Sequence, residues 1–211
     1  MNLYLYKNKF LFKEIKNDIV IEHELLVQEL SRRLSIKTLK FLQKITLNNK
    51  KGLLTNFLKD SKLLCHYKRE LNIEQKIELQ RIILLDILIG NRDRHTANLF
   101  INKHITAFDH DKILKDRTRK SSVFVKLDVG QKLDKDYIEK LEEIIVDGNV
   151  ITKTALLKYF GFNKEGILKI KSITNNEFYN IIKPLKLDKV EKNRVINFLI
   201  YRRNNFDTLP Y

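Results

Sequence analysis

The sequence predicts an α+β protein with a reduced, β-rich N-terminal lobe and a larger helical C-terminal lobe. Two patterns lead to this prediction. Hydrophobic and polar residues alternate over residues 3–12, as in strands, whereas beyond residue 72 the apolar residues recur at helical spacing. We place the boundary near residues 58–60, so the N-terminal lobe covers residues 1–59 and the C-terminal lobe residues 60–211.

Composition narrows the class of protein. The 211 residues are 43% hydrophobic and 32% charged, which is too apolar for a disordered chain and too charged for a membrane bundle. The longest strongly apolar run, Ile82 to Ile89, is interrupted by Asp86 and is far shorter than the ~20 residues of a membrane-spanning helix. The N-terminus lacks the pattern of a signal peptide, so we expect a cytoplasmic protein, or one delivered as an effector.

The charge first suggests a polyanionic partner. Lys and Arg number 41 against 26 Asp and Glu, which gives a net charge of +15. However, the 30 lysines outnumber the 11 arginines and are scattered through every segment, whereas a nucleic-acid footprint gathers on one face with arginine prominent. Nucleic-acid binding is therefore the least favoured of the functions considered.

The first sixty residues predict the order β-β-α-β-β. A hairpin ends at Lys13, and a helix covers residues 18–34, with Asp18 available as its N-cap. Two further strands are expected over residues 38–47 and 52–58, separated by the polar residues 48–51.

The remaining residues predict mainly helices. Asn72 and Gln75 form a capping box before a very apolar helix that ends at Gly90, and a small hairpin follows over residues 99–108. Beyond Leu127 we expect only helices, and these cover residues 134–146, 152–160, 163–172, 175–183 and 188–205.

Three oxygen-bearing side chains follow the apolar helix in a pattern suited to phosphoryl transfer. Asp93 and Asn98 lie in the loop after Gly90, and the hairpin then leads to Asp109. Such chemistry needs a carboxylate that orients the acceptor hydroxyl, together with a carboxamide and a second carboxylate that hold Mg²⁺ against the phosphates.

The string Ile-Gly-Asn-Arg-Asp-Arg-His-x-x-Asn, Ile89 to Asn98, resembles the catalytic loop of the protein-kinase-like superfamily. Its Asp-Arg-His-x-x-Asn form is similar to that of HipA-type kinases and phosphatidylinositol-kinase-like enzymes, so the resemblance implies a two-lobe protein-kinase-like fold. It also implies roles for individual residues: Asp93 as catalytic base, His95 positioning the transferring phosphate, Asn98 and Asp109 binding the metal, and Arg92 and Arg94 as phosphate-binding or loop-anchoring cations.

The same resemblance implies a strand lysine that contacts nucleotide phosphates and pairs with a helix glutamate. Lys13 fits the strand position and Glu24 the helix position, with Glu29 as the alternative partner about one turn later. The residues expected to contact adenine are Thr55, Asn56 and Phe57.

The chain also departs from the family pattern. No glycine precedes Gly52, so the Gly-rich loop that covers the phosphates is missing or replaced, and Asp111 stands where a glycine usually follows the second metal ligand. Residues 117–122 read as a solvated basic loop, with autophosphorylation as the alternative. The other histidines show no zinc-ligand spacing with one another or with the single Cys65, so no zinc site is expected.

The resemblance implies an ATP- and Mg²⁺-dependent kinase, most simply a Ser/Thr protein kinase with a protein substrate. A toxin of a toxin–antitoxin pair or an effector suits the resemblance, with an antitoxin or other partner chain completing the N-terminal lobe. The alternatives are a pseudokinase or nucleotide-binding module without turnover, and a small-molecule or lipid kinase.

Overall fold

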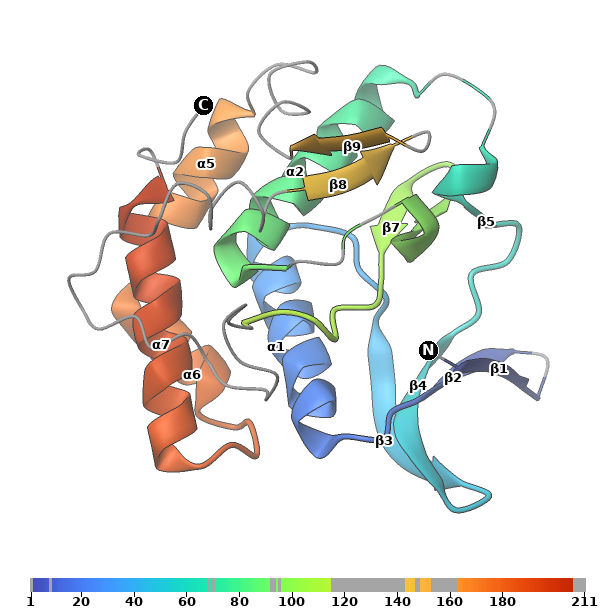
Figure 1. The fold of residues 1–211 in the computed structure, drawn as a ribbon, viewed down its shortest axis with the longest axis horizontal. Helices are drawn as coiled ribbons and strands as arrows, with labels where there is room; N and C mark the ends of the chain where they lie inside the picture. The colour runs from blue at the N-terminus through green and yellow to red at the C-terminus, as the bar shows by residue number, and fades with distance from the viewer. Residues whose placement is uncertain are drawn as a thin grey trace.

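The chain folds into two lobes, as a computed structural model shows (Figure 1). The four-stranded sheet lies on one side of helix α1 (Asp18–Leu34). The helices α5 (Lys164–Lys171), α6 (Asn175–Ile182) and α7 (Lys189–Asn204) lie on its other side. The structure describes residues 2–7, 9–67, 69, 71–91, 94, 96–114, 143–146, 149–152 and 163–206.

The N-terminal sheet is antiparallel with the strand order β1-β2-β4-β3. Its strands are β1 (Asn2–Tyr6), β2 (Phe10–Glu14), β3 (Phe41–Leu47) and β4 (Lys50–Asn56). The predicted turn over residues 48–51 is too long: Asn48 and Asn49 alone make it, with φ of 48° and 61°. Asparagine tolerates this left-handed backbone, which matches the twist of a two-residue hairpin, so the strand resumes at Lys50.

Helix α1 (Asp18–Leu34) has the predicted bounds but a different cap. The Asn17 side chain accepts a hydrogen bond from the Ile19 N–H, so Asn17 is the N-cap, and Asp18 is the first helical residue. An acidic residue in the first turn stabilises the helix through its dipole. The prediction of Asp18 as the cap was therefore wrong by one residue.

Helix α2 (Ile73–Ile89) runs through the C-terminal lobe as predicted, with the capping box of Asn72 and Gln75 at its start. Gly90 ends it in the left-handed conformation, with φ of 60°. A three-stranded sheet in the order β5-β6-β7 packs nearby, formed by β5 (Lys62–Leu63), β6 (Leu99–Ile101) and β7 (Ile105–Ala107). One short 3-10 turn follows β5 at Leu64–His66, and another precedes β6 at Thr96–Asn98. Neither these turns nor β5 were predicted.

Among the described residues beyond Leu127, helix begins at residue 164. Helices α5 (Lys164–Lys171), α6 (Asn175–Ile182) and α7 (Lys189–Asn204) confirm three predicted helices. By contrast, β8 (Glu143–Val146) lies where the end of a helix was predicted, and it pairs with β9 (Asn149–Thr152) as an antiparallel hairpin. Most of β9 lies in the predicted connection between two helices, and only Thr152 belongs to the second of them. The β-branched residues on either side of an Asp-Gly pair are a hairpin signal, and the helical interpretation overlooked them. The remainder of those two predicted helices lies outside the described residues.

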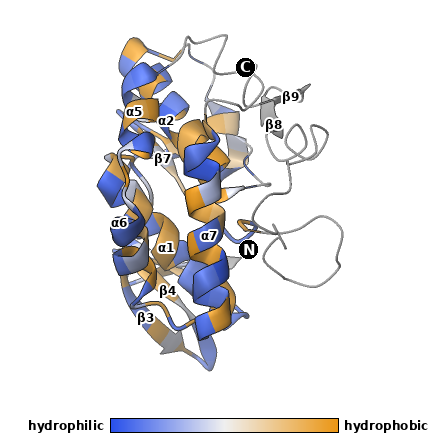
Figure 2. Cartoon of the chain, turned by 90° about the vertical axis from the view of Figure 1, so that its left-hand side faces the viewer, coloured by the Kyte–Doolittle hydropathy of each residue, from blue (hydrophilic) through white to orange (hydrophobic). Residues whose placement is uncertain are grey.

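Two hydrophobic clusters form the core. The larger joins α1 and α2 to the C-terminal helices, and the smaller lies beneath the N-terminal sheet around Ile21, Phe41 and Leu53. In Figure 2 the ribbon of α6 carries both hydrophobic and hydrophilic colour, as expected of a helix that buries one face, here with Phe178 and Ile182. Among the described residues, no helix has the length and apolar character needed to cross a membrane.

Gly52 permits the close approach of β4 to β2. A Cβ atom at this position would lie 2.1 Å from the Lys13 carbonyl oxygen and 2.6 Å from the Phe12 ring. We expect Gly52→Ala to lower the free energy of unfolding by about 2 to 3 kcal/mol, because a backbone atom cannot rotate away from the added methyl group. Urea denaturation measures this change.

Gly166→Ala is the matched control. The Cβ atom added there would meet the end of the flexible Leu84 side chain. Alanine also favours the helical conformation over glycine, so we expect a smaller loss of stability than at Gly52. Equal losses in the two variants would contradict the close approach between β2 and β4.

Candidate active site

A buried ion pair between Asp86 and Arg94 anchors the loop that follows α2. Arg94 Nε lies 2.8 Å from Asp86 Oδ2, and Arg94 Nη2 lies 3.2 Å from Asp86 Oδ1. The Asn91 side chain donates to the same Oδ1 at 2.7 Å. Asp86, which interrupts the apolar run of α2, therefore holds residues on both sides of position 93 in the sequence.

Arg94 also joins this loop to the β6–β7 hairpin. Its Nη1 donates to the carbonyl oxygens of Asn98 at 2.9 Å and Phe108 at 2.8 Å. The side chain is almost fully buried, so its charge is paired inside the protein. Of the two roles that the resemblance implied, Arg94 has that of a loop anchor.

The β6–β7 hairpin brings the regions of Asn98 and Asp109 together. Leu99 pairs with Ala107, and the Phe108 N–H donates to the Asn98 carbonyl oxygen at 3.2 Å. Asn98 is buried at the start of the hairpin, and Asp109 follows Phe108 directly at its end. Two residues eleven positions apart in the sequence thus share one end of a hairpin.

The segment between α1 and β3 binds the hairpin to the N-terminal lobe. The Ala107 N–H donates to the Lys37 carbonyl oxygen, and the Leu39 N–H donates to the Ala107 carbonyl oxygen, each at 3.0 Å. Phe108 then packs into the cluster beneath the N-terminal sheet and stacks on Phe100 with ring centroids 4.3 Å apart. These contacts place Asp109 next to β2.

Lys13 of β2 meets two carboxylates. Its ammonium group is hydrogen-bonded to Glu24 Oε1 of α1 and, at 2.8 Å, to Asp109 Oδ1. The side chains of Lys13 and Glu24 are 4% and 1% exposed, so this charged set lies inside the protein. The predicted lysine, helix glutamate and second metal ligand therefore converge between the two lobes.

His110 is a further member of the site that the sequence did not indicate. Its backbone N–H donates to Glu24 Oε1 at 2.8 Å, and its ring Nδ1 lies 3.2 Å from Glu24 Oε2. Glu24 therefore binds both the lysine strand and the loop after Asp109. The one departure that the sequence showed nearby was Asp111 in place of the usual glycine, and it does not by itself indicate a contact between His110 and α1.

The charges of this set hold one another ionised. Burial opposes the charge on Lys13, but Glu24 and Asp109 outweigh it and raise the Lys13 pKa above its usual 10.5. Burial alone would raise the pKa of Glu24, but the Lys13 ammonium group and the hydrogen bond from His110 hold that pKa well below its usual 4.5. Glu24 is therefore a carboxylate throughout the physiological pH range.

A cavity of about 430 Å³ opens beside this charged set. Its lining includes Lys13, Lys16, Asp109 and Asp111, and its volume falls in the usual range of small-molecule sites. The left-handed backbone of this loop lies at Asp109, with φ of 61°, and not at Asp111. A glycine is therefore not required at position 111, which explains why a carboxylate is tolerated there.

Other predicted site residues do not line this cavity. Glu29 pairs with Arg32 at the surface, so the alternative to Glu24 is not used. Thr55 is buried and donates to the Lys40 carbonyl oxygen, while Asn56 and Phe57 are exposed. None of these residues lines the 430 Å³ cavity, so their contact with adenine stays a prediction.

Several predicted features lie outside the described residues. These are the catalytic residues Asp93 and His95, Arg92, and the basic segment 117–122. Their roles stay predictions from the sequence.

The two lobes and the charged cleft between them define a kinase-like protein. The chain belongs to the phosphatidylinositol 3- and 4-kinase family, which matches residues 5–157. This match confirms the kinase resemblance that the loop sequence indicates. No curated protein matches the sequence.

One solved structure shows that the fold is shared with a known kinase. The crystal structure of the Helicobacter pylori proinflammatory kinase CtkA matches with a TM-score of 0.58 at 14% identity, over 98% of this chain and 91% of that chain. A chain of the Shewanella oneidensis MR-1 toxin–antitoxin complex of HipA, HipB and operator DNA matches with a TM-score of 0.48 at 13% identity. That match covers 99% of this chain and only 62% of the other.

Removal of the Glu24 charge should destabilise the fold. We expect Glu24→Gln to lower the free energy of unfolding at neutral pH by about 3 kcal/mol, because it breaks a buried ion pair, although Asp109 still pairs with Lys13. Glu29→Gln, which affects a surface pair, should change stability by no more than about 0.5 kcal/mol. Chemical denaturation distinguishes the two, and similar effects would contradict the central place of Glu24.

The contribution of Glu24 should also depend on pH in a defined direction. Because its pKa is lowered in the folded chain, the unfolded chain takes up this proton first as the pH falls. The difference in free energy of unfolding between wild type and Glu24→Gln should therefore have its full size above the ordinary pKa of 4.5 and become smaller as the pH falls below it. Denaturation of both proteins from neutral pH to about pH 3 measures this, and a constant difference would refute it.

Proposed function

We propose that this chain is an ATP- and Mg²⁺-dependent kinase that phosphorylates Ser or Thr hydroxyl groups of a protein. The family and the fold support a phosphotransferase in general. The observation that supports the nucleotide site is the meeting of Lys13 with Glu24 and Asp109 at the edge of the 430 Å³ cavity. The Ser or Thr acceptor is proposed from the resemblance of the loop to that of HipA-type kinases.

The chemistry of the site fits a magnesium nucleotide. Asp109 supplies a carboxylate and Asn98 a carboxamide from the same end of one hairpin, and Mg²⁺ uses few protein ligands when phosphate oxygens complete its shell. Lys13 and Lys16 place positive charge on the same cavity. In this proposal the metal neutralises phosphate charge, and Lys13 orients the phosphates while Glu24 keeps its ammonium group in place.

The proposed reaction transfers the terminal phosphoryl group of ATP. The bond between that phosphorus and the ADP oxygen breaks, and a bond from the phosphorus to the acceptor hydroxyl oxygen forms. Asp93 accepts the hydroxyl proton, and His95 positions the phosphate. The Asp86–Arg94 anchor supports this proposal because precise orientation supplies much of the rate of phosphoryl transfer.

The remaining parts of the proposal concern the N-terminal lobe. We assign residues 1–59 to the N-terminal lobe and residues 60–211 to the C-terminal lobe. Within the N-terminal lobe, we assign the contacts with adenine to Thr55, Asn56 and Phe57.

A partner chain such as an antitoxin stays a prediction from the sequence. The same holds for a cytoplasmic or effector location.

A phosphatidylinositol kinase is the second candidate function. The description of the family favours it, since the enzymes that name the family are phosphatidylinositol kinases. In this case the acceptor is a hydroxyl group of the inositol ring. The residues assigned to the nucleotide and its metal, Lys13, Asn98 and Asp109, keep the same roles.

ATP labelled at its terminal phosphate tests the proposal. We expect wild-type protein with Mg²⁺ to label itself or a protein in a lysate, and Asp93→Ala to reduce labelling by at least about 100-fold, since a positioned base contributes that much. Asp109→Ala should reduce it similarly through loss of a metal ligand, whereas Glu29→Gln should retain it.

The distribution of label separates the candidate functions. Label in acid-precipitated protein supports the protein kinase, and label extracted with phosphatidylinositol into organic solvent supports the lipid kinase instead. Nucleotide binding without any transfer would refute both and favour a pseudokinase. If the chain neither binds ATP nor transfers phosphate, the nucleotide site itself is refuted.

A further inference from the structure

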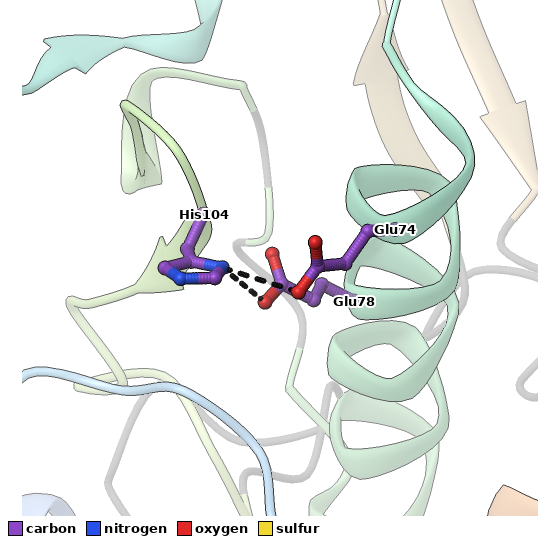
Figure 3. Close-up of side chains that lie close together, drawn as sticks. All are labelled: Glu74, Glu78 and His104. Atoms are coloured by element: carbon purple, nitrogen blue, oxygen red, sulfur yellow. Dashed lines mark hydrogen bonds and ion pairs between the residues drawn. The ribbon is translucent and has the colours of Figure 1, made fainter.

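Three ligand-bearing side chains meet far along α2 from the candidate active site. Glu74 and Glu78 lie one turn apart near the start of α2, and His104 projects toward them from the turn between β6 and β7 (Figure 3). Asn98 and Asp109 lie at the opposite end of the same hairpin. This cluster is therefore separate from the residues assigned to the nucleotide.

The distances between the donor atoms suit a small tetrahedral cation. His104 Nδ1 lies 2.9 Å from Glu78 Oε1 and 3.7 Å from Glu74 Oε1, and the three ligand atoms all lie within 4.8 Å of one another. Ligands about 2.0 to 2.1 Å from a tetrahedral Zn²⁺ are separated by about 3.3 Å, a value between these two distances. A fourth position remains for water or another ligand.

Hydrogen bonds hold the Glu78 carboxylate and the main chain at His104. The Ile105 N–H donates to Glu78 Oε2 at 2.8 Å, which leaves Oε1 directed at His104. The His104 N–H donates to Asn102 Oδ1 at 2.9 Å, and the Asn102 carbonyl oxygen accepts from the Gln75 side chain at 3.1 Å. Such supporting hydrogen bonds hold ligands in place and strengthen metal binding.

One cation of the chain itself competes for this position. Lys37 Nζ lies 2.7 Å from Glu78 Oε1, the atom that faces His104. The Lys37 side chain is 45% exposed, whereas that of Glu78 is 11% exposed. The lysine can therefore move into solvent while the carboxylate stays in place.

We propose that Glu74, Glu78 and His104 form a binding site for a first-row divalent cation, with Zn²⁺ as the best match. An imidazole nitrogen with two carboxylates selects such ions over Mg²⁺ and Ca²⁺, which prefer oxygen ligands alone. The bound cation ties the start of α2 to the turn of the β6–β7 hairpin. It therefore stabilises the element whose other end carries Asn98 and Asp109.

Calorimetric titration of the full chain with ZnCl₂, after removal of metals by a chelator, tests this site. Cys65→Ser serves as the background, because an exposed thiol is the strongest competing zinc ligand. We expect one Zn²⁺ to bind in this background and to raise the melting temperature. Titration with MgCl₂ should show no binding that depends on His104.

Single variants give the decisive comparison. Glu74→Gln and His104→Gln should each weaken Zn²⁺ binding at least about tenfold, and Lys37→Gln should strengthen it because the competing cation is gone. The Glu74 side chain is 63% exposed, so its variant should fold normally, as melting without metal can verify. His66→Gln, which alters an exposed histidine outside the cluster, should leave binding unchanged.

Three outcomes would overturn the proposal. They are the loss of Zn²⁺ binding in Cys65→Ser, equal binding by Cys65→Ser with and without Glu74→Gln, and weaker binding when Lys37→Gln is added to that background. None of these readouts depends on kinase activity, so the zinc site and the proposed function are tested separately.

Discussion

The Glu24 carboxylate is the interaction on which the arrangement of the site depends. One oxygen binds the Lys13 ammonium group and the His110 N–H, and the other lies against the His110 ring. These contacts join β2, α1 and the loop after Asp109, which belong to different parts of the sequence. Because the group is buried, a missing partner would leave a charge without compensation, so the three elements are strongly constrained to one geometry.

A second buried carboxylate plays the corresponding part in the C-terminal lobe. Asp86 binds Arg94 and Asn91, and Arg94 extends the network to the carbonyl oxygens of Asn98 and Phe108. The loop after α2 and the end of the hairpin are thereby held to the helix. The two networks meet at Phe108 and Asp109, where one residue packs under the sheet and the next binds Lys13.

The β6–β7 hairpin connects the two proposed sites. Its open end carries Asn98 and Asp109, and its turn carries His104 beside Glu78 of α2. The hairpin also pairs with the segment after α1, through Ala107. A cation at the turn would therefore act on an element that already contacts both lobes, and its effect would be on the stability of the site and not on the phosphoryl transfer itself.

The sequence by itself determined the features that depend on near neighbours. These include α2 with its capping box and Gly90, the bounds of α1, the first hairpin ending near Lys13, and the loop motif that indicated the family. It failed at β8, where a helix was predicted, and it missed the pairing of β8 with β9 although the flanking residues carry a hairpin signal. Only the tertiary structure decided between Glu24 and Glu29, showed Arg94 as an anchor, and brought His110 and His104 to their carboxylates. Caps and turns are local interactions, whereas these contacts join residues far apart in the chain and form only when the lobes pack.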